Sequence, residues 1–229
     1  MPKEEIPEPI PAATVILLRE RNSIVETLML RKNKDITFGG MWVFPGGVIE
    51  DEDMPADGDI NAAARTAAAR ETAEEAGIET DSEDFVWFAQ WTPPPMPRIR
   101  FRTWFFAAKT SGDETIEIDG DEIHEHSWIN PGQALEKHKA GEIKLVAPTW
   151  VTLYYLSRYP TADAILKRFS STPPKIYESH HGTTESGDRA VFWHGDSGYE
   201  TWDANLPGER HRILMKGEEY IFQNTIEQY

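Results

Sequence analysis

Residues 70–78 read Arg70-Glu71-Thr72-Ala73-Glu74-Glu75-Ala76-Gly77-Ile78, and an alanine-rich run, Asn61 to Ala69, leads into them. Neither Gly nor Pro interrupts these residues before Gly77, and strong helix formers dominate them. Gly77 stands where a glycine commonly ends a helix, because glycine adopts left-handed backbone without strain. The pattern therefore predicts one helix of about four to five turns that ends near Ala76.

The two sides of this predicted helix differ in chemistry. At about 100° per residue, one stripe holds only small residues, and we expect it to press against a sheet. Its members are Ala62, Thr66, Ala69, Ala73 and Ala76. The other side carries Arg70 with three carboxylates, those of Glu71, Glu74 and Glu75.

Three carboxylates within about one helical turn need a physical explanation. Glu71 and Glu75 are four residues apart, and like charges at that spacing destabilise a helix by about 0.2–0.5 kcal/mol. A divalent cation such as Mg²⁺ would remove the conflict, because it binds carboxylate oxygens. Arg70 can reach Glu74 one turn away and hold it in place. The alternative is a solvated acidic face, which is what charge runs usually form.

The residues before the helix favour the metal site. Phe44-Pro45-Gly46-Gly47 precedes it, followed by the acids Glu50 and Asp53. Together the two segments resemble the signature of the Nudix hydrolases: a glycine, five residues, an acid, seven residues, then Arg-Glu-x-x-Glu-Glu-x-Gly and an aliphatic residue. The second half matches at every fixed position. Asp53 stands where the family usually has Glu, and sixteen residues rather than seven separate it from Arg70, so the loop around residues 54–59 is an insertion.

The resemblance implies a fold and a metal centre. The fold is α+β, an α/β/α sandwich with a mixed β-sheet. The cofactor is Mg²⁺ or Mn²⁺, with Glu71 and Glu75 as principal ligands, joined by Glu74 and by the backbone carbonyl of Gly46. Arg70 is expected to orient Glu74. A metal-activated water would then hydrolyse the pyrophosphate bond of a nucleoside diphosphate linked to another moiety, X.

Two further groups of residues are candidates for the site. Nudix proteins often supply one more carboxylate from a strand or loop facing the helix, as a ligand or a base, and Glu122 is our choice, with Glu125 second. On the strand predicted from Arg98 to Ala108, Arg98, Arg100 and Arg102 share one face by alternation. Guanidinium groups suit phosphate oxygens, so these arginines are candidate substrate-binding residues. Alternatively, they neutralise the acidic surface.

The identity of X is less well defined by the sequence. Leu28-Met29-Leu30-Arg31-Lys32, the segment around Pro45 and the inserted loop look similar to the coenzyme A diphosphatase branch of the family. Arg102 stands where that branch is expected to carry Asp. Coenzyme A or a related ADP-containing compound is therefore the first expectation, and ADP-ribose or a dinucleotide is the second. A Nudix fold that senses a nucleotide without hydrolysing it is the alternative from another class; the intact Glu71 and Glu75 pair argues against it.

Composition limits the partners. The 229 residues carry a net charge of −16, which argues against nucleic acid as a partner because the electrostatic term would be repulsive. No stretch approaches the roughly 20 apolar residues of a membrane span. Cysteine is absent, so disulfides are excluded, and a cytoplasmic location is expected. The seven histidines show no helical zinc spacing, so we interpret them as structural or solvent-facing.

The order of predicted elements gives the domain organisation. Residues 1–11 are expected to be a flexible N-terminal segment, residues 12–140 the Nudix core, and residues 141–229 an extension packed on that core. Strands are predicted at 13–18, 24–30, 41–44, 85–91, 98–108 and 122–129, with helices at 131–140, 147–158 and 162–169. Extended segments are expected at 173–177, 189–194 and 212–215. The extension would shape the pocket or form a homodimer contact.

Overall fold

The central element is a mixed eight-stranded sheet, seen in a computed structural model that describes residues 6–96, 99–217 and 219–226. The strand order is β3-β2-β1-β6-β5-β8, with β4 also pairing with β1 and β7 with β2. β1 pairs parallel with β6 and antiparallel with β2 and β4. The strands are β1 (Ile10–Arg21), β2 (Ile24–Lys32), β3 (Trp42–Val43), β4 (Gly46–Val48), β5 (Val86–Thr92), β6 (Phe101–Lys109), β7 (Ile123–Ile129) and β8 (Lys175–Glu178).

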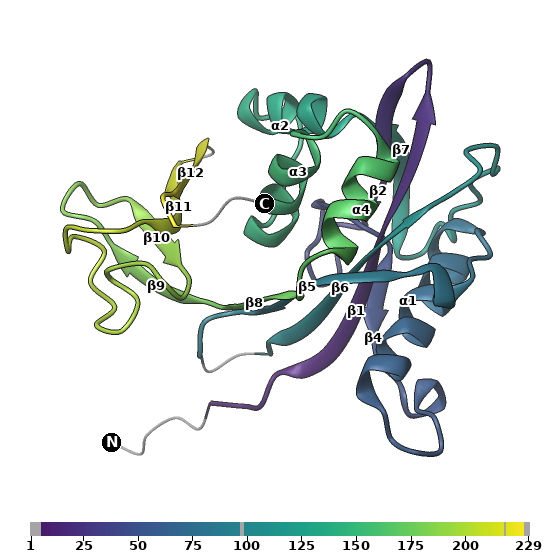
Figure 1. The fold of residues 1–229 in the computed structure, drawn as a ribbon, viewed down its shortest axis with the longest axis horizontal. Helices are drawn as coiled ribbons and strands as arrows, with labels where there is room; N and C mark the ends of the chain where they lie inside the picture. Colours follow the sequence, from purple (N-terminus) through teal and green to yellow (C-terminus); the bar gives the residue numbers. More distant parts are fainter. Residues whose placement is uncertain (1–5, 97–98, 218, 227–229) are drawn as a thin grey trace.

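Helices cover both faces of this sheet (Figure 1). α1 (Ile60–Ala76) lies on one face, and α2 (Pro131–Lys139), α3 (Ala147–Leu156) and α4 (Ala162–Ser170) lie on the other; η1 (Asp51–Asp53) and η2 (Ser82–Asp84) are short 3₁₀ turns. Side chains alternate between the two faces of a strand. Val15 and Leu17 of β1 therefore pack with the alanines of α1, while Ile16 and Leu18 pack with α3 and α4. The predicted α+β fold, a three-layer sandwich with a mixed sheet, is confirmed.

The stripe of α1 predicted to face the sheet was wrong except at Ala76, which is buried. Ala62 and Thr66 are not buried, and the buried side consists of Ala63, Ala64, Ala67, Ala68, Thr72, Glu75 and Ala76. Both sides of the helix are rich in alanine, so size could not distinguish them. The sheet takes the side that carries Glu75, because that carboxylate bonds to the backbone of β4. The predicted end of the helix is confirmed: Gly77 has φ +67° and its N–H bonds to the carbonyl of Ala73.

The N-terminal half differs from expectation in strand lengths. β1 begins at Ile10, inside the segment predicted to be a lead-in, because Ile10 pairs with Phe101 of β6. The hairpin between β1 and β2 turns at Asn22 and Ser23, which both have positive φ, as a tight two-residue hairpin turn requires. The middle of β6 is buried on both faces, since helices cover both, and so it lacks the predicted alternation.

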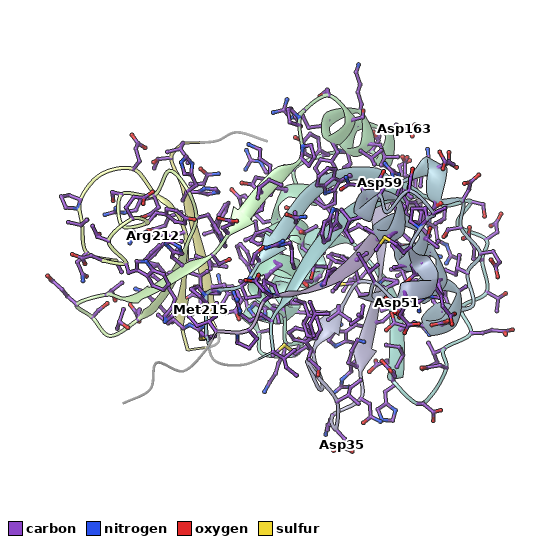
Figure 2. The ribbon with its side chains drawn as sticks, turned by 90° about the horizontal axis from the view of Figure 1, so that it is seen from below. Asp35, Asp51, Asp59, Asp163, Arg212 and Met215 are labelled. Atoms are coloured by element: carbon purple, nitrogen blue, oxygen red, sulfur yellow. The ribbon has the colours of Figure 1, made fainter. Side chains whose placement is uncertain are left out.

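The C-terminal extension joins the core more closely than predicted. Its strand β8 extends the main sheet by pairing parallel with β5. Beyond it, a second, antiparallel sheet has the order β12-β11-β10-β9. Its strands are β9 (His180–Thr183), β10 (Arg189–Phe192), β11 (His211–Lys216) and β12 (Glu219–Asn224). Figure 2 shows Arg212 and Met215 on this sheet, at the opposite end of the molecule from Asp51 and Asp59 beside α1.

Aromatic side chains connect the two sheets. The ring of Trp91 in β5 stacks on Tyr177 in β8 with centroids 3.7 Å apart, and the edge of Trp193 meets both rings. These residues belong to the same apolar core as α3 and α4. The extension is therefore packed against the sandwich rather than tethered to it. No helix in the described part of the chain is long and apolar enough to cross a membrane.

Candidate active site

Two glycines bring the sheet into contact with the acidic side of α1. The N–H of Gly46 donates to Oε2 of Glu75 at 2.9 Å. A Cβ at Gly46 would lie 2.3 Å from the carbonyl oxygen of Ala13, and a Cβ at Gly47 would lie 2.2 Å from a carboxylate oxygen of Glu71. Only glycine permits such close approach. The Gly46-Gly47 turn therefore sets where the carboxylates of Glu71 and Glu75 lie.

Glu75 is the most deeply buried glutamate of the site, with only 3% of its surface exposed. Burial raises its pKa to about 7, although Lys32 and the N–H of Gly46 partly offset that rise. Nζ of Lys32, at the end of β2, lies 3.1 Å from Oε1 of Glu75 and 3.4 Å from Oε2 of Glu122. Burial lowers the pKa of Lys32, but the two carboxylates outweigh burial and raise it above its ordinary value. Lys32 thus bridges β2, α1 and the entrance to β7.

Arg70 organises the remaining acids. Its Nε and Nη2 bond to the two carboxylate oxygens of Asp53 at 3.1 and 3.0 Å, and Nη1 bonds to Glu71 at 2.9 Å and to Glu74 at 3.1 Å. The hydrogen bonds to Asp53 are the first cause of a raised pKa of Arg70. Burial raises the pKa of Glu71, and Arg70 partly offsets it. The predicted contact between Arg70 and Glu74 is present.

Asp53 and Lys32 are site residues to which sequence reasoning gave no role. Asp53 is buried, and its Oδ2 also accepts the N–H of Glu50, which closes the η1 turn. Despite its shorter side chain, it forms a two-pronged pair with Arg70. The signal for Asp53 was its position in the family pattern. Lys32 had no local signal, because its contacts depend on how β2 pairs with β7.

The other predicted residues lie further from α1. The side chain of Glu122 is 60% exposed and reaches the site through Lys32, whereas Glu125 pairs with Arg31. Arg100 is buried and donates to the carbonyls of Pro7 and Pro93. Arg102 is half-buried in β6, opposite Pro11 of β1. Arg98 lies outside the described residues.

The side chains suit a hard divalent cation. Across residues 6–96, 99–217 and 219–226, no three His, Asp or Glu side chains already converge as a metal site. Lys32 instead supplies the positive charge at Glu75. The donors at hand are all oxygens, from the carboxylates of Glu71, Glu74 and Glu75 beside the Gly46-Gly47 turn, and oxygen donors are what Mg²⁺ and Mn²⁺ prefer. The residues therefore fit such an ion.

Comparison with known proteins agrees with this geometry. A NUDIX domain family model matches residues 8–148. A Nudix hydrolase of Alicyclobacillus acidocaldarius superposes with a TM-score of 0.63 at 23% identity, over 74% of this chain and 100% of that chain. The Nudix domain of Shewanella oneidensis NrtR, solved with ADP-ribose, gives 0.51 at 14% identity, over 66% and 88% of the two chains. At these identities the two structures show a shared fold.

The family match spans more than half of the chain. The chain belongs to the Nudix family and is a pyrophosphohydrolase of that family. The matched residues contain β1 to β7, α1 and α2, and so include all the acids described above, while β8 to β12 lie beyond them.

Replacing Gly47 with alanine is expected to lower turnover without unfolding the protein. The new methyl group would meet the carboxylate of Glu71, the flexible end of a side chain, which moves aside instead of breaking the fold. Loss of a group that positions a metal ligand typically costs about 10–100-fold in metal affinity or activity. Since Gly47 positions Glu71, a predicted ligand, we expect a loss in that range in kcat/KM. Gly132→Ala in α2 is the matched control, and equal activity of the two variants would contradict the role given to Gly47.

The raised pKa of Glu75 predicts how stability depends on pH in EDTA. The folded pKa is about 7 against an ordinary 4.5, so the folded state is penalised once Glu75 ionises. The unfolding free energy of the wild type should therefore fall, relative to Glu75→Gln, by roughly 3 kcal/mol as pH rises from about 5 to about 8. Urea unfolding of both proteins across this range measures the difference. If the unfolding free energies of the wild type and of Glu75→Gln changed in parallel with pH, the burial of the Glu75 carboxylate would be contradicted.

Proposed function

We propose that this protein is a Mg²⁺- or Mn²⁺-dependent hydrolase that cleaves the pyrophosphate bond of a nucleoside diphosphate linked to X. The observation that carries the proposal is the contact between α1 and the Gly46-Gly47 turn, which gathers Glu71 and Glu75 at one point of the sheet. Water adds to one phosphorus and the P–O–P bridge breaks. The products are two phosphate monoesters, a nucleoside monophosphate and phosphorylated X.

Each residue has a distinct task in this proposal. Glu71 and Glu75 hold the ion, with Glu74 and the carbonyl of Gly46 as further ligands. When bound, the ion neutralises the pyrophosphate and lowers the pKa of a water molecule. Arg70 positions Glu71 and Glu74 through hydrogen bonds of 2.9 and 3.1 Å. Glu122, exposed at the rim, is a further ligand or the base that accepts a proton from the attacking water.

For the substrate we propose coenzyme A or another ADP-containing diphosphate, with ADP-ribose or a dinucleotide as the second candidate. The support is the sequence similarity of residues 28–32 and of the inserted loop to the coenzyme A diphosphatase branch. Arg102, half-buried near the start of β6, is a proposed substrate-binding residue. Arg100 is less available to a substrate, because its guanidinium group already donates to two backbone carbonyls.

A panel of substrates tests the function. Purified protein is incubated with coenzyme A, an acyl-coenzyme A, ADP-ribose, NADH and diadenosine polyphosphates, each with Mg²⁺, Mn²⁺ or EDTA, and the products are identified by mass. We expect metal-dependent release of two phosphate monoesters, with one substrate cleaved well above the others, and no cleavage in EDTA. Absence of turnover with every substrate, with Mn²⁺ still bound, would replace the hydrolase by a nucleotide-sensing function.

A further inference from the structure

A cavity of about 410 Å³ lies beside the Lys32 end of β2, which is within the range of about 300–1,000 Å³ for small-molecule sites. Its lining contains more cations than acids, although the chain carries a net charge of −16. The lining residues are Arg31, Lys32, Asn33, Lys34, Asp35 and His124. We call this cavity the basic pocket.

The wall of the basic pocket is held by backbone hydrogen bonds. The loop after β2 folds back on Lys32, whose N–H bonds to Met41 and whose carbonyl accepts from Gly40, both at 3.0 Å. Asn33 ties the loop to the entrance of β7, through its N–H to Glu122 at 2.7 Å and its side chain to Asp121 at 3.0 Å. Asp35 lies at the outer edge of the molecule in Figure 2, so this wall faces solvent. A ligand would therefore meet a preorganised surface.

The cations of the basic pocket are available to an anion. Lys34 is exposed, and no ion pair to it occurs in the described part of the chain. Arg31 pairs with Glu125 at 3.1 Å, but the two side chains are 39% and 54% exposed, and pairs that reach solvent contribute only about 0–1 kcal/mol. An incoming phosphate can therefore compete with Glu125 for the guanidinium group.

Lys32 joins the basic pocket to the catalytic acids. Its side chain lines the pocket, while its ammonium group lies 3.1 Å from Glu75 and 3.4 Å from Glu122. If a substrate places its pyrophosphate at Glu71 and Glu75, another charged group of the same substrate can therefore reach the basic pocket. The lining is polar and cationic, so that group is an anion rather than an apolar chain.

We propose that the basic pocket binds a phosphate group of the substrate other than the pyrophosphate that is cleaved. The preferred substrates are then diphosphate compounds that carry at least one additional phosphate. Arg31 and Lys34 provide the charge and hydrogen-bond donors for it, and Lys32 separates it from the ion. That the bound phosphate belongs to a substrate rests on the proposed hydrolase function. Binding of a phosphate anion to the pocket can be measured without turnover.

Calorimetric titration of the metal-free protein with inorganic pyrophosphate in EDTA tests the pocket directly. Compared with the wild type, Arg31→Gln/Lys34→Gln should raise the Kd at least about tenfold, because two charge-assisted contacts are lost. Lys137→Gln, which removes a half-exposed lysine of α2, should leave the Kd within about twofold. Failure of the wild type to bind, or the same Kd in the double variant, would overturn the proposal.

Kinetics with paired substrates provide the second test. NADPH and NADH differ by one phosphate, as do coenzyme A and its 3′-dephospho form. The wild type should prefer the phosphorylated member of the pair it cleaves by about tenfold or more in KM at similar kcat, and the double variant should lose that preference. Equal KM values of the wild type for both members of a pair would overturn the proposal that the basic pocket binds the additional phosphate. If neither pair is hydrolysed, coenzyme A is ruled out as the substrate, and the proposed hydrolase function fails only if the rest of the substrate panel is also uncleaved. In either case the pyrophosphate titration still decides whether the pocket binds phosphate.

Discussion

Glu75→Gln is expected to lower kcat by about 10³-fold or more while the protein stays folded. Glutamine has the same shape, and its carbonyl oxygen can still accept the N–H of Gly46 that Glu75 accepts at 2.9 Å. It cannot supply the negative charge with which Glu75 is proposed to hold a divalent ion, and such an ion contributes several kcal/mol to stabilising a transition state. Since each 1.36 kcal/mol corresponds to tenfold in rate, a loss of this size follows.

The matched control for this variant is Glu79→Gln. Glu79 is an exposed glutamate just beyond the end of α1, so the substitution makes the same change of net charge without touching the site. Turnover is measured with saturating Mg²⁺, and folding by circular dichroism and thermal unfolding. A Glu75→Gln enzyme with wild-type kcat would refute the assignment of Glu75. Loss of folded structure would be separated from loss of catalysis by these spectra.

The parts of the site that sequence predicted are those determined by nearby residues. The end of α1 at Gly77 depends on a backbone conformation that glycine alone adopts easily. The match of the second half of the family pattern reflects spacing along one helix, which a sequence displays directly. The link between Arg70 and Glu74 follows from the same spacing.

The parts that sequence missed depend on distant contacts. The buried side of α1 is chosen by a bond from Glu75 to Gly46, 29 residues away, and alanines on both sides gave no indication of it. Lys32 meets Glu122 because β2 and β7 pair across a separation of 90 residues. Arg100 alternates as a surface residue would, yet it is buried by the N-terminal segment that bonds to it. β8 joins β5 in parallel from beyond three helices, and no local pattern specifies such a partner.

Arg212→Met is expected to destabilise the protein by about 3–5 kcal/mol at pH 7. Arg212 is 2% exposed in the centre of the second sheet, and its Nε donates to Oδ2 of Asp196 at 2.7 Å. Its remaining donors reach Oδ1 of Asp196 and the carbonyl of Ala204. Methionine fills much of the space but leaves Asp196 as a buried charge without its cation, and that is the costly change.

The pKa of Asp196 predicts how the destabilisation by Arg212→Met changes with pH. Burial raises the pKa of Asp196, but hydrogen bonds from Arg212 and from the N–H groups of His211 and Gly198 outweigh it, so the pKa lies below its ordinary 3.8. The stabilisation is therefore present above about pH 4 and is lost as pH falls further. The difference in unfolding free energy between wild type and Arg212→Met should accordingly be larger at pH 7 than at pH 3.

Urea unfolding followed by tryptophan fluorescence measures the effect, because Trp193 lies in the core shared by both sheets. Arg189→Met, an exposed arginine on the neighbouring strand β10, is the matched control and should cost less than about 0.5 kcal/mol. In Arg212→Met/Asp196→Asn the unpaired charge is removed as well, so this double variant should lose less than the sum of the two single losses. Additive losses, or a cost for Arg212→Met no greater than that for Arg189→Met, would show that the buried pair does not hold the second sheet together.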